Sequence, residues 1–194
     1  GRKTTPFVYF NGKASPADLK SFGWGSGPSS SLEVAEGEGL DSTNALKWTM
    51  GGDGWSVTGA GWNIDPKHNM SYEWMKDSVT FKYKTSKFSG NNIRLQYEAG
   101  SGKLVKEVDI VADDTWRNVT VALQDFVYGD NTTSGFDTSK VGVFQFIAQG
   151  SGYQGETIML TEIWTGSPSF DFVAPNVAGN VDAIPGNYTN AVVW

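Results

Sequence analysis

The stretch DDTWRNVTVALQDF, residues 113–126, joins a polar turn to a segment in which every second residue is apolar. Val119, Val121 and Leu123 fall on one face and Thr120 on the other, because side chains alternate along a β-strand. A strand with one apolar and one polar face is typical of an antiparallel sheet that covers a core on one side only. The stretch therefore predicts a β-strand and favours an all-β fold.

The same alternation recurs along the chain. Residues 78–85 (SVTFKYKT) alternate, and so do residues 92–98 (NIRLQYE), where Gly100-Ser101-Gly102 then leads into another strand and predicts a β-hairpin. Further strand candidates are residues 30–36 (SSLEVAE), 44–50 (NALKWTM), 54–64 (GWSVTGAGWNI), 141–150 (VGVFQFIAQG) and 156–166 (ETIMLTEIWTG). Eight or more short strands and no convincing helix predict an all-β antiparallel β-sandwich of the jelly-roll type.

Composition supports this fold class and limits the partners. The 194 residues include 24 Gly, 8 Trp, 7 Tyr and 11 Phe, and only 19% are charged, which favours β structure. A net charge of −6 argues against nucleic acid or an anionic membrane as partner, since both require a basic surface. No apolar run of membrane-spanning length is present, so we expect no membrane insertion. The absence of Cys excludes disulfides and thiolate chemistry.

The chain divides into two parts by composition. Residues 1–166 carry the strand pattern and form the predicted β-sandwich module. Residues 167–194 begin as a Pro-containing segment of low charge and end in NYTNAVVW, which alternates like a first strand. We interpret 167–194 as a linker and the start of a truncated following domain. The module is then expected to be covalently linked to neighbouring domains in a parent protein.

One motif raises the question of catalysis. Glu107-Val-Asp109 resembles the catalytic strand of retaining β-glucanases of the laminarinase and lichenase family, which carries three carboxylates at alternate positions. A retaining mechanism needs two carboxyl groups about 5–5.5 Å apart, one of them as acid/base. The third position here is Val111. The single histidine, His68, lies in a polar loop without a triad pattern, so we predict no catalytic residue.

Three segments, in this order, resemble carbohydrate-binding modules with a galactose-binding-like jelly-roll fold. They are DSTNALKWTM (41–50), DDTWRNVTVALQDF (113–126) and TIMLTEIWTG (157–166), and the resemblance covers residues 7–166. It implies a non-catalytic module that tethers a glycan-degrading enzyme or a surface glycan-binding protein to a polysaccharide, most simply a β-glycan in a concave groove. It also implies a bacterial protein that is secreted or displayed at the cell surface.

The expected site follows from the chemistry of sugars, whose C–H faces stack on aromatic rings and whose hydroxyls need polar partners. Trp residues among glycines are the candidate platforms, and polar residues that alternate out of apolar strands are the candidate hydrogen-bonding groups. The predicted carbohydrate-binding residues are Trp24, Trp55, Trp62, Arg94, Gln96, Glu98, Gln145 and Gln149.

The resemblance further implies a structural calcium, held by acidic groups of an early loop and of the closing strand. Residues 35–44 (AEGEGLDSTN) offer Glu36, Glu38 and Asp41 as oxygen ligands. The closing strand has Thr161 at the usual acidic position and leaves Glu162 as the nearest carboxylate. The expected metal ligands are therefore Glu36, Glu38, Asp41 and Glu162.

Two other functions stay open at this stage. The chain could be a small jelly-roll glycan hydrolase or lyase whose carboxylates are not paired in any recognisable motif. It could also be a structural or protein-interaction module in which all the aromatic residues belong to the core. In the second case, substitution of a predicted platform Trp would unfold the protein instead of abolishing binding.

Overall fold

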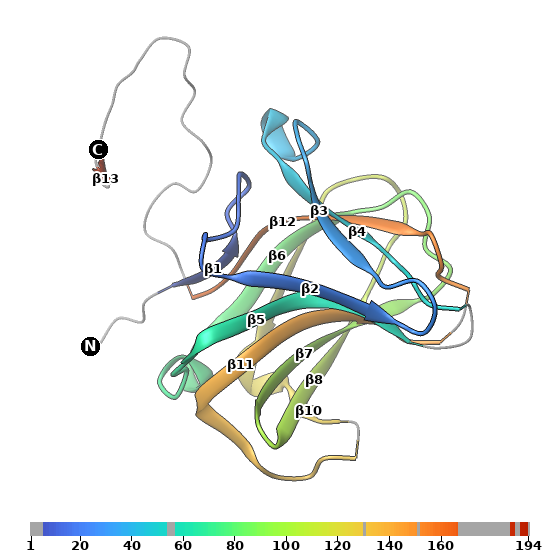
Figure 1. Cartoon of the computed structure of the whole chain (residues 1–194). Coiled ribbons are helices and arrows are strands. Elements are labelled where there is room, and N and C mark those ends of the chain that lie inside the picture. The colour runs from blue at the N-terminus through green and yellow to red at the C-terminus, as the bar shows by residue number, and fades with distance from the viewer. Residues whose placement is uncertain are drawn as a thin grey trace.

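Two antiparallel sheets pack face to face in the computed structural model, which describes residues 6–53, 57–129, 131–150, 152–166, 187–188 and 191–193 (Figure 1). The first sheet, called here the β6 sheet, has the order β3 (Ser31–Ala35), β4 (Ala45–Thr49), β12 (Thr157–Thr165), β6 (Ser78–Lys84) and β9 (Arg117–Ala122), and β1 (Phe7–Phe10) also pairs with β12. The second, the β11 sheet, has the order β10 (Val127–Tyr128), β8 (Gly102–Asp109), β7 (Asn92–Gly100), β11 (Phe136–Ala148), β5 (Thr58–His68) and β2 (Lys20–Gly25). The predicted all-β sandwich is confirmed.

Helical structure among the described residues is limited to short 3-10 turns. They are η1 (Leu40–Ser42), η2 (Glu73–Met75) and η3 (Leu123–Asp125). Within the described residues there is no helix that is long and apolar enough to cross a membrane.

The predicted hairpin is present as β7 and β8, which pair from Asn92↔Asp109 to Ala99↔Gly102. The strand expected from the alternation of Val119, Val121 and Leu123 is also confirmed as β9, which ends at Ala122 and pairs with β6. Its apolar face continues into η3, where Leu123 is fully buried.

Aromatic residues fill the space between the sheets. Phe144 of β11 lies at the centre, with its ring centroid 4.6 Å from that of Tyr97 and 4.8 Å from that of Tyr9. Trp62 stacks parallel to Phe144 at 6.2 Å, and Trp48 from the opposite sheet contacts Phe146. Contacts of this kind stabilise the core beyond the burial of apolar area alone. The core therefore forms from the inner face of each sheet, as the alternation predicts.

A β-bulge divides β11 into two parts. Val141 pairs with Ala99 of β7, and Val143 pairs with the next residue, Glu98, so that two steps along β11 match one step along β7. The extra residue is Gly142. A bulge of this kind reverses which side chains face the core. Val141 is consequently buried in the core, although Val143, two residues later, lies on the outer face.

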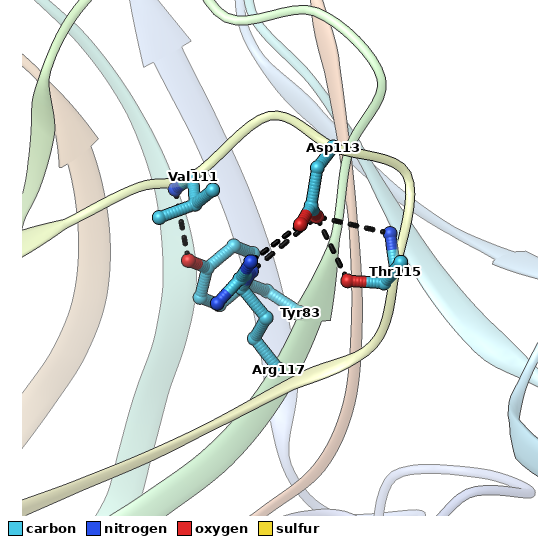
Figure 2. A network of polar contacts seen from close by, with 5 residues as sticks. All are labelled: Tyr83, Val111, Asp113, Thr115 and Arg117. Carbon is cyan, nitrogen blue, oxygen red and sulfur yellow. Dashed lines mark hydrogen bonds and ion pairs between the residues drawn. The ribbon is translucent and has the colours of Figure 1, made fainter.

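The turn before β9 is fixed by a polar network (Figure 2). Asp113 accepts hydrogen bonds from Thr115 Oγ1 at 2.8 Å and from the Thr115 amide, and it forms an ion pair with Arg117. The hydroxyl of Tyr83, on β6, accepts a hydrogen bond from the Val111 amide at 2.9 Å. The bonds from Arg117 and Thr115 lower the pKa of Asp113 from 3.8 to about 2. The network thereby ties the connection between β8 and β9 to β6.

The predicted linker and truncated domain, residues 167–194, fall mostly outside the described residues. Only β13 (Asn187–Tyr188) and β14 (Ala191–Val193) are described there, and their backbones pair antiparallel. The predicted boundary after residue 166 and the linkage to a further domain stay predictions.

Candidate functional site

The outer face of the β11 sheet carries three rows of side chains that run across its strands. Directly paired residues of neighbouring antiparallel strands point to the same face, so the pairing register defines each row. The first row is Trp24, Gly59, Ile147, Arg94 and Glu107; the second is Phe22, Gly61, Gln145, Gln96 and Val105; the third is Lys20, Asn63, Val143, Glu98 and Lys103. These rows form the floor and the flanks of the candidate site.

Two glycines hollow the surface between β2 and β11. Gly59 and Gly61 occupy β5 in the first two rows, so this strand projects no side chain there. A Cβ atom at Gly59 would lie 2.8 Å from Trp24 Nε1, and one at Gly61 would lie 2.2 Å from the Phe144 carbonyl oxygen. Only glycine fits at such contacts. The result is an open groove of about 620 Å³.

A chain of hydrogen bonds crosses the groove floor. Trp24 Nε1 donates to Gln145 Oε1 at 2.7 Å, and Gln145 Nε2 donates to Glu98 Oε2 at 2.8 Å. Gln96 Nε2 donates to the same oxygen of Glu98 at 2.9 Å. Gln96 and Gln145 are 2% and 5% exposed, although both lie on the outer face of the sheet. The network fixes the orientation of both amides and of the indole before any ligand arrives.

Charged groups occupy one flank. Arg94 Nε lies 2.8 Å from Glu107 Oε2, across β7 and β8. Lys103 lies beside Glu98 in the third row and also lines the groove. The groove thus has an aromatic and aliphatic side near β2 and a charged side near β8.

The structure brings together most of the residues predicted for sugar binding. Trp24, Arg94, Gln96, Glu98, Gln145 and Gln149 all line this one groove. Three strands far apart in the sequence, β2, β7 and β11, supply them, with Gln149 directly after β11. Their role in binding stays a prediction. Trp55 lies outside the described residues.

Trp62 does not belong to the site, and this prediction was wrong. Its side chain is 1% exposed and packs against Tyr9 and Phe144 between the sheets. The cause is strand alternation: Trp62 shares a face with Ala60, which is also fully buried, whereas Gly61 faces the groove. A buried indole cannot present its ring to a ligand, so Trp62 is a core residue.

Several lining residues were not predicted from the sequence. They are Phe22, Val57, Lys103, Val143 and Ile147. Phe22 alternates with Trp24 in the segment KSFGWG, so the spacing of two residues was an available signal. Val143 and Ile147 lie two residues on either side of Gln145, so the outward position predicted for Gln145 was an available signal for both.

The expected calcium ligands do not form a cluster. Within the described part of the chain, no group of three His, Cys, Asp or Glu side chains lies close enough together to hold a metal ion. Glu162 instead lies 2.7 Å from Lys82 Nζ, so an ammonium group already neutralises that carboxylate. The four predicted residues therefore do not fit the metal site that the sequence suggested, and calcium binding stays an untested prediction.

Glu107 and Asp109, the two carboxylates of the predicted catalytic motif, are not joined by a third carboxylate on the same face of the chain. Glu107 is bound to Arg94, and the position after Asp109 on that face is the exposed Val111. His68 stacks on Phe7 with ring centroids 4.4 Å apart, and burial lowers its pKa. Neither feature assembles the acid/base pair of a glycosidase.

Comparison with solved structures reveals extensive similarity in fold. A family 30 carbohydrate-binding module superposes with a TM-score of 0.65 at 19% identity, covering 91% of this chain and 94% of the module. A family 11 module from Clostridium thermocellum, in complex with a β-1,3-1,4-mixed-linked tetrasaccharide, gives a TM-score of 0.58 at 14% identity, with coverages of 83% and 95%. An exo-β-agarase matches over 25% of its own length, with a TM-score of 0.57 at 14% identity.

Sequence comparison adds nothing to these similarities. No protein-family model matches the chain, and no curated protein sequence matches it. At these levels of identity the structures establish the fold, which is the β-sandwich of carbohydrate-binding modules. They confirm the fold that the three sequence segments implied.

Proposed function

We propose that the protein binds a polysaccharide, most simply a β-glycan, along the groove of the β11 sheet without catalysing a reaction. One observation carries the proposal: Trp24 is hydrogen-bonded to the Gln145–Glu98–Gln96 network on one hollowed face of the sheet. The solved module in complex with a mixed-linked tetrasaccharide supports the choice of ligand class, because it has the same fold.

Trp24 provides the stacking surface. The indole has a single hydrogen-bond donor, Nε1, and Gln145 occupies it at 2.7 Å. The ring therefore offers a ligand only its apolar surface, which suits the C–H face of a pyranose. Its position on the edge strand β2, beside Gly59, places it along one side of the groove.

The polar floor provides recognition of hydroxyl groups. Sugar hydroxyls both donate and accept, and carboxylate and amide groups are their complementary partners. Gln145 joins Trp24 to Glu98, and Gln96 contacts Glu98, so a stacking surface and hydrogen-bonding groups occur on one face. Both features depend on side chains already held in place, which reduces the entropy lost on binding.

The test is a titration of intrinsic tryptophan fluorescence with laminarin, mixed-linkage glucan, xylan, mannan and alginate. We expect a saturable change with at least one polymer. In Trp24→Phe the change should largely disappear, whereas Trp116→Phe, a variant of the half-buried Trp116 beside Lys84 on the β6 sheet, should retain it. No response to any polymer, together with no retardation in affinity electrophoresis, would refute the proposal.

The enzyme alternative predicts a different result. A hydrolase releases reducing ends from one of the same polymers, and a lyase releases an unsaturated product. We expect neither, since Glu107 is bound to Arg94 and Glu98 accepts two amide hydrogen bonds. Product release that is lost in Glu98→Gln would favour the enzyme.

The proposed context is a secreted or cell-surface protein in which the module is covalently linked to neighbouring domains and targets them to glycan. The match to a quarter of an exo-β-agarase supports this, because a similar sandwich forms part of a larger protein there. A protein-interaction module is the remaining alternative, and it predicts that glycans leave the fluorescence unchanged.

A further inference from the structure

Phe22, on the edge strand β2, is an aromatic residue that the core does not use. All the other Phe residues that the structure describes belong to the core between the sheets or pack against it. Phe22 is half-buried, and no other aromatic ring of the described chain contacts it. Its side chain instead lines the groove. An apolar ring that is turned away from the core and towards a groove is available to a ligand.

Phe22 and Trp24 lie on the same face of β2, because they are two residues apart on the strand. The rise of a strand places their Cα atoms about 7 Å apart. Phe22 is paired with Gly61 of β5, and Trp24 is paired with Gly59. Neither glycine has a side chain that could stand between a ring and the groove. The two rings therefore border the groove one after the other along β2.

The polar neighbours of Phe22 leave its ring to the ligand. Gln145, which follows Gly61 in the same row, is 5% exposed and already engaged in the hydrogen bonds of the groove floor. Lys20 and Asn63 in the third row are both exposed, so they can reach the hydroxyl groups of a sugar at this end of the groove. A phenyl ring has no polar atom, so stacking on a C–H face is the contribution that it can make.

We infer that Phe22 is a second stacking surface, which binds the sugar residue next to the one on Trp24. A single pyranose covers one aromatic ring, whereas two linked pyranoses cover two rings in succession. In this part of the groove the glycan chain then follows β2, over the two glycines of β5. The inference rests on the proposed function and makes it more specific, because it assigns two adjoining sugar residues to the edge strand.

The alternative is that Phe22 only supports Trp24 at one shared sugar. In that case, removal of the Phe22 ring weakens the binding of every oligosaccharide by the same factor. If Phe22 binds a sugar of its own, the loss appears only with oligosaccharides that are long enough to reach it. The dependence of the loss on chain length therefore decides between the two roles, and a general loss of stability would not produce it.

The decisive experiment measures dissociation constants for a series of chain lengths. The ligands run from the methyl glycoside of a single residue to the hexasaccharide, all prepared from the polymer of the panel that binds most tightly. The indole N–H resonance of Trp24 in NMR spectra reports binding beside that ring even when it is weak. We expect Phe22→Ala to bind the single residue within about twofold of the unmodified protein and the hexasaccharide about tenfold more weakly, which corresponds to about 1.4 kcal/mol.

Two further variants complete the experiment. Phe22→Leu keeps a large apolar side chain but has no flat ring, and it should show the same length-dependent loss even if circular dichroism finds Phe22→Ala unfolded. The matched control is Tyr128→Ala, which removes an aromatic ring from β10 at the opposite edge of the same sheet. Tyr128 is paired with the buried Leu104, so it does not face the groove. This control should bind every chain length as the unmodified protein does.

The outcomes separate the two proposals. An equal loss at every chain length in the Phe22 variants, or no loss with the hexasaccharide, overturns the second stacking surface and leaves the proposed function standing. A loss of the same size in Tyr128→Ala also overturns it, because the effect would then not belong to the groove. Absence of binding of the unmodified protein to every polymer of the panel overturns the proposed function and the second stacking surface with it.

Discussion

The two sheets of the sandwich share one core but have very different outer faces. On the β6 sheet, the row formed by Glu33, Lys47, Met159 and Lys84 is exposed or half-buried, as expected of a surface in water. On the β11 sheet, Gln96 and Gln145 face outward and are nevertheless buried. Both amides donate hydrogen bonds to Glu98 on the same face, so this surface carries a recessed, pre-ordered site.

The contrast between the two outer faces can be tested at the groove floor, where the largest effect on stability and binding is expected. Gly61→Ala places a Cβ 2.2 Å from the Phe144 carbonyl oxygen and 2.5 Å from Gln145 Cα, so the backbones of β5 and β11 must separate. We expect a loss of about 3 kcal/mol in the free energy of unfolding, measured by urea denaturation, together with loss of glycan binding.

The matched control for this change is Gly142→Ala on the neighbouring strand. Its Cβ meets only the end of the flexible Lys67 side chain at 3.4 Å. Stability close to that of the unmodified protein is expected. If both variants were equally destabilised, the strict need for glycine at position 61 would be disproved.

A second change removes the aromatic side of the groove. Trp24→Ala eliminates the stacking surface, and we expect glycan affinity to fall about 30-fold, equivalent to about 2 kcal/mol, because a central aromatic contact usually dominates a binding site. Trp116→Ala, on the other sheet, should bind normally. Isothermal titration calorimetry measures both, and circular dichroism checks that each variant is folded.

A third change tests the β6 sheet and should leave binding untouched. Lys82→Met removes the partner of Glu162, which is 14% exposed and sits in a left-handed backbone conformation at a bulge of β12. We expect stability to decrease by about 1 kcal/mol, between the values for exposed and buried ion pairs. Affinity for the best polymer of the panel should stay unchanged.

The effect of calcium on the melting temperature is the second test on this sheet. Because Lys82 already neutralises Glu162, we expect the same melting temperature in calcium chloride and in a chelator. A higher melting temperature in calcium would show that a metal site exists after all.

The smallest effect concerns pH and the turn shown in Figure 2. The pKa of Asp113 falls from 3.8 to about 2 in the folded protein, so its contribution to stability is complete above pH 4 and is lost as the pH falls towards 2. Asp113→Asn should therefore weaken the decrease in stability between pH 4 and 2. Because the pair is exposed, the change should be small, and it should shrink further at high salt. If the free energy of unfolding fell equally between pH 4 and 2 in Asp113→Asn and in the unmodified protein, the lowered pKa of Asp113 would be contradicted.

The fold was predictable because alternation is a local property. β6, β7 and β9 alternate strictly in sequence, and each buries the face that its apolar residues define. Gln96 and Gln145 were predictable for the same reason, as polar residues that alternate out of apolar strands. Trp62 was misplaced although the signal was present, since it shares its face with Ala60 and Ile64, both buried.

Other features depend on tertiary pairing and were out of reach. The hydrogen bond between Trp24 and Gln145 joins residues 121 positions apart, and only the strand order β11-β5-β2 brings them together. The ion pair of Lys82 with Glu162 likewise spans 80 positions. It engages the carboxylate that was expected to bind calcium. No local pattern encodes such a pair.

The bulge at Gly142 has a consequence for how this surface can change. Val141 and Val143 point to opposite sides of the sheet only because one extra residue lies between their pairing positions. It acts as a phase shift: the chain before it and the chain after it follow separate inside–outside frames. Deleting that one residue would place both parts in one frame. Because the part after the bulge buries Phe144, Phe146 and Ala148, the part before it would turn over and bring Val141 to the solvent. The segment that precedes the bulge can therefore change without altering which side chains reach the groove.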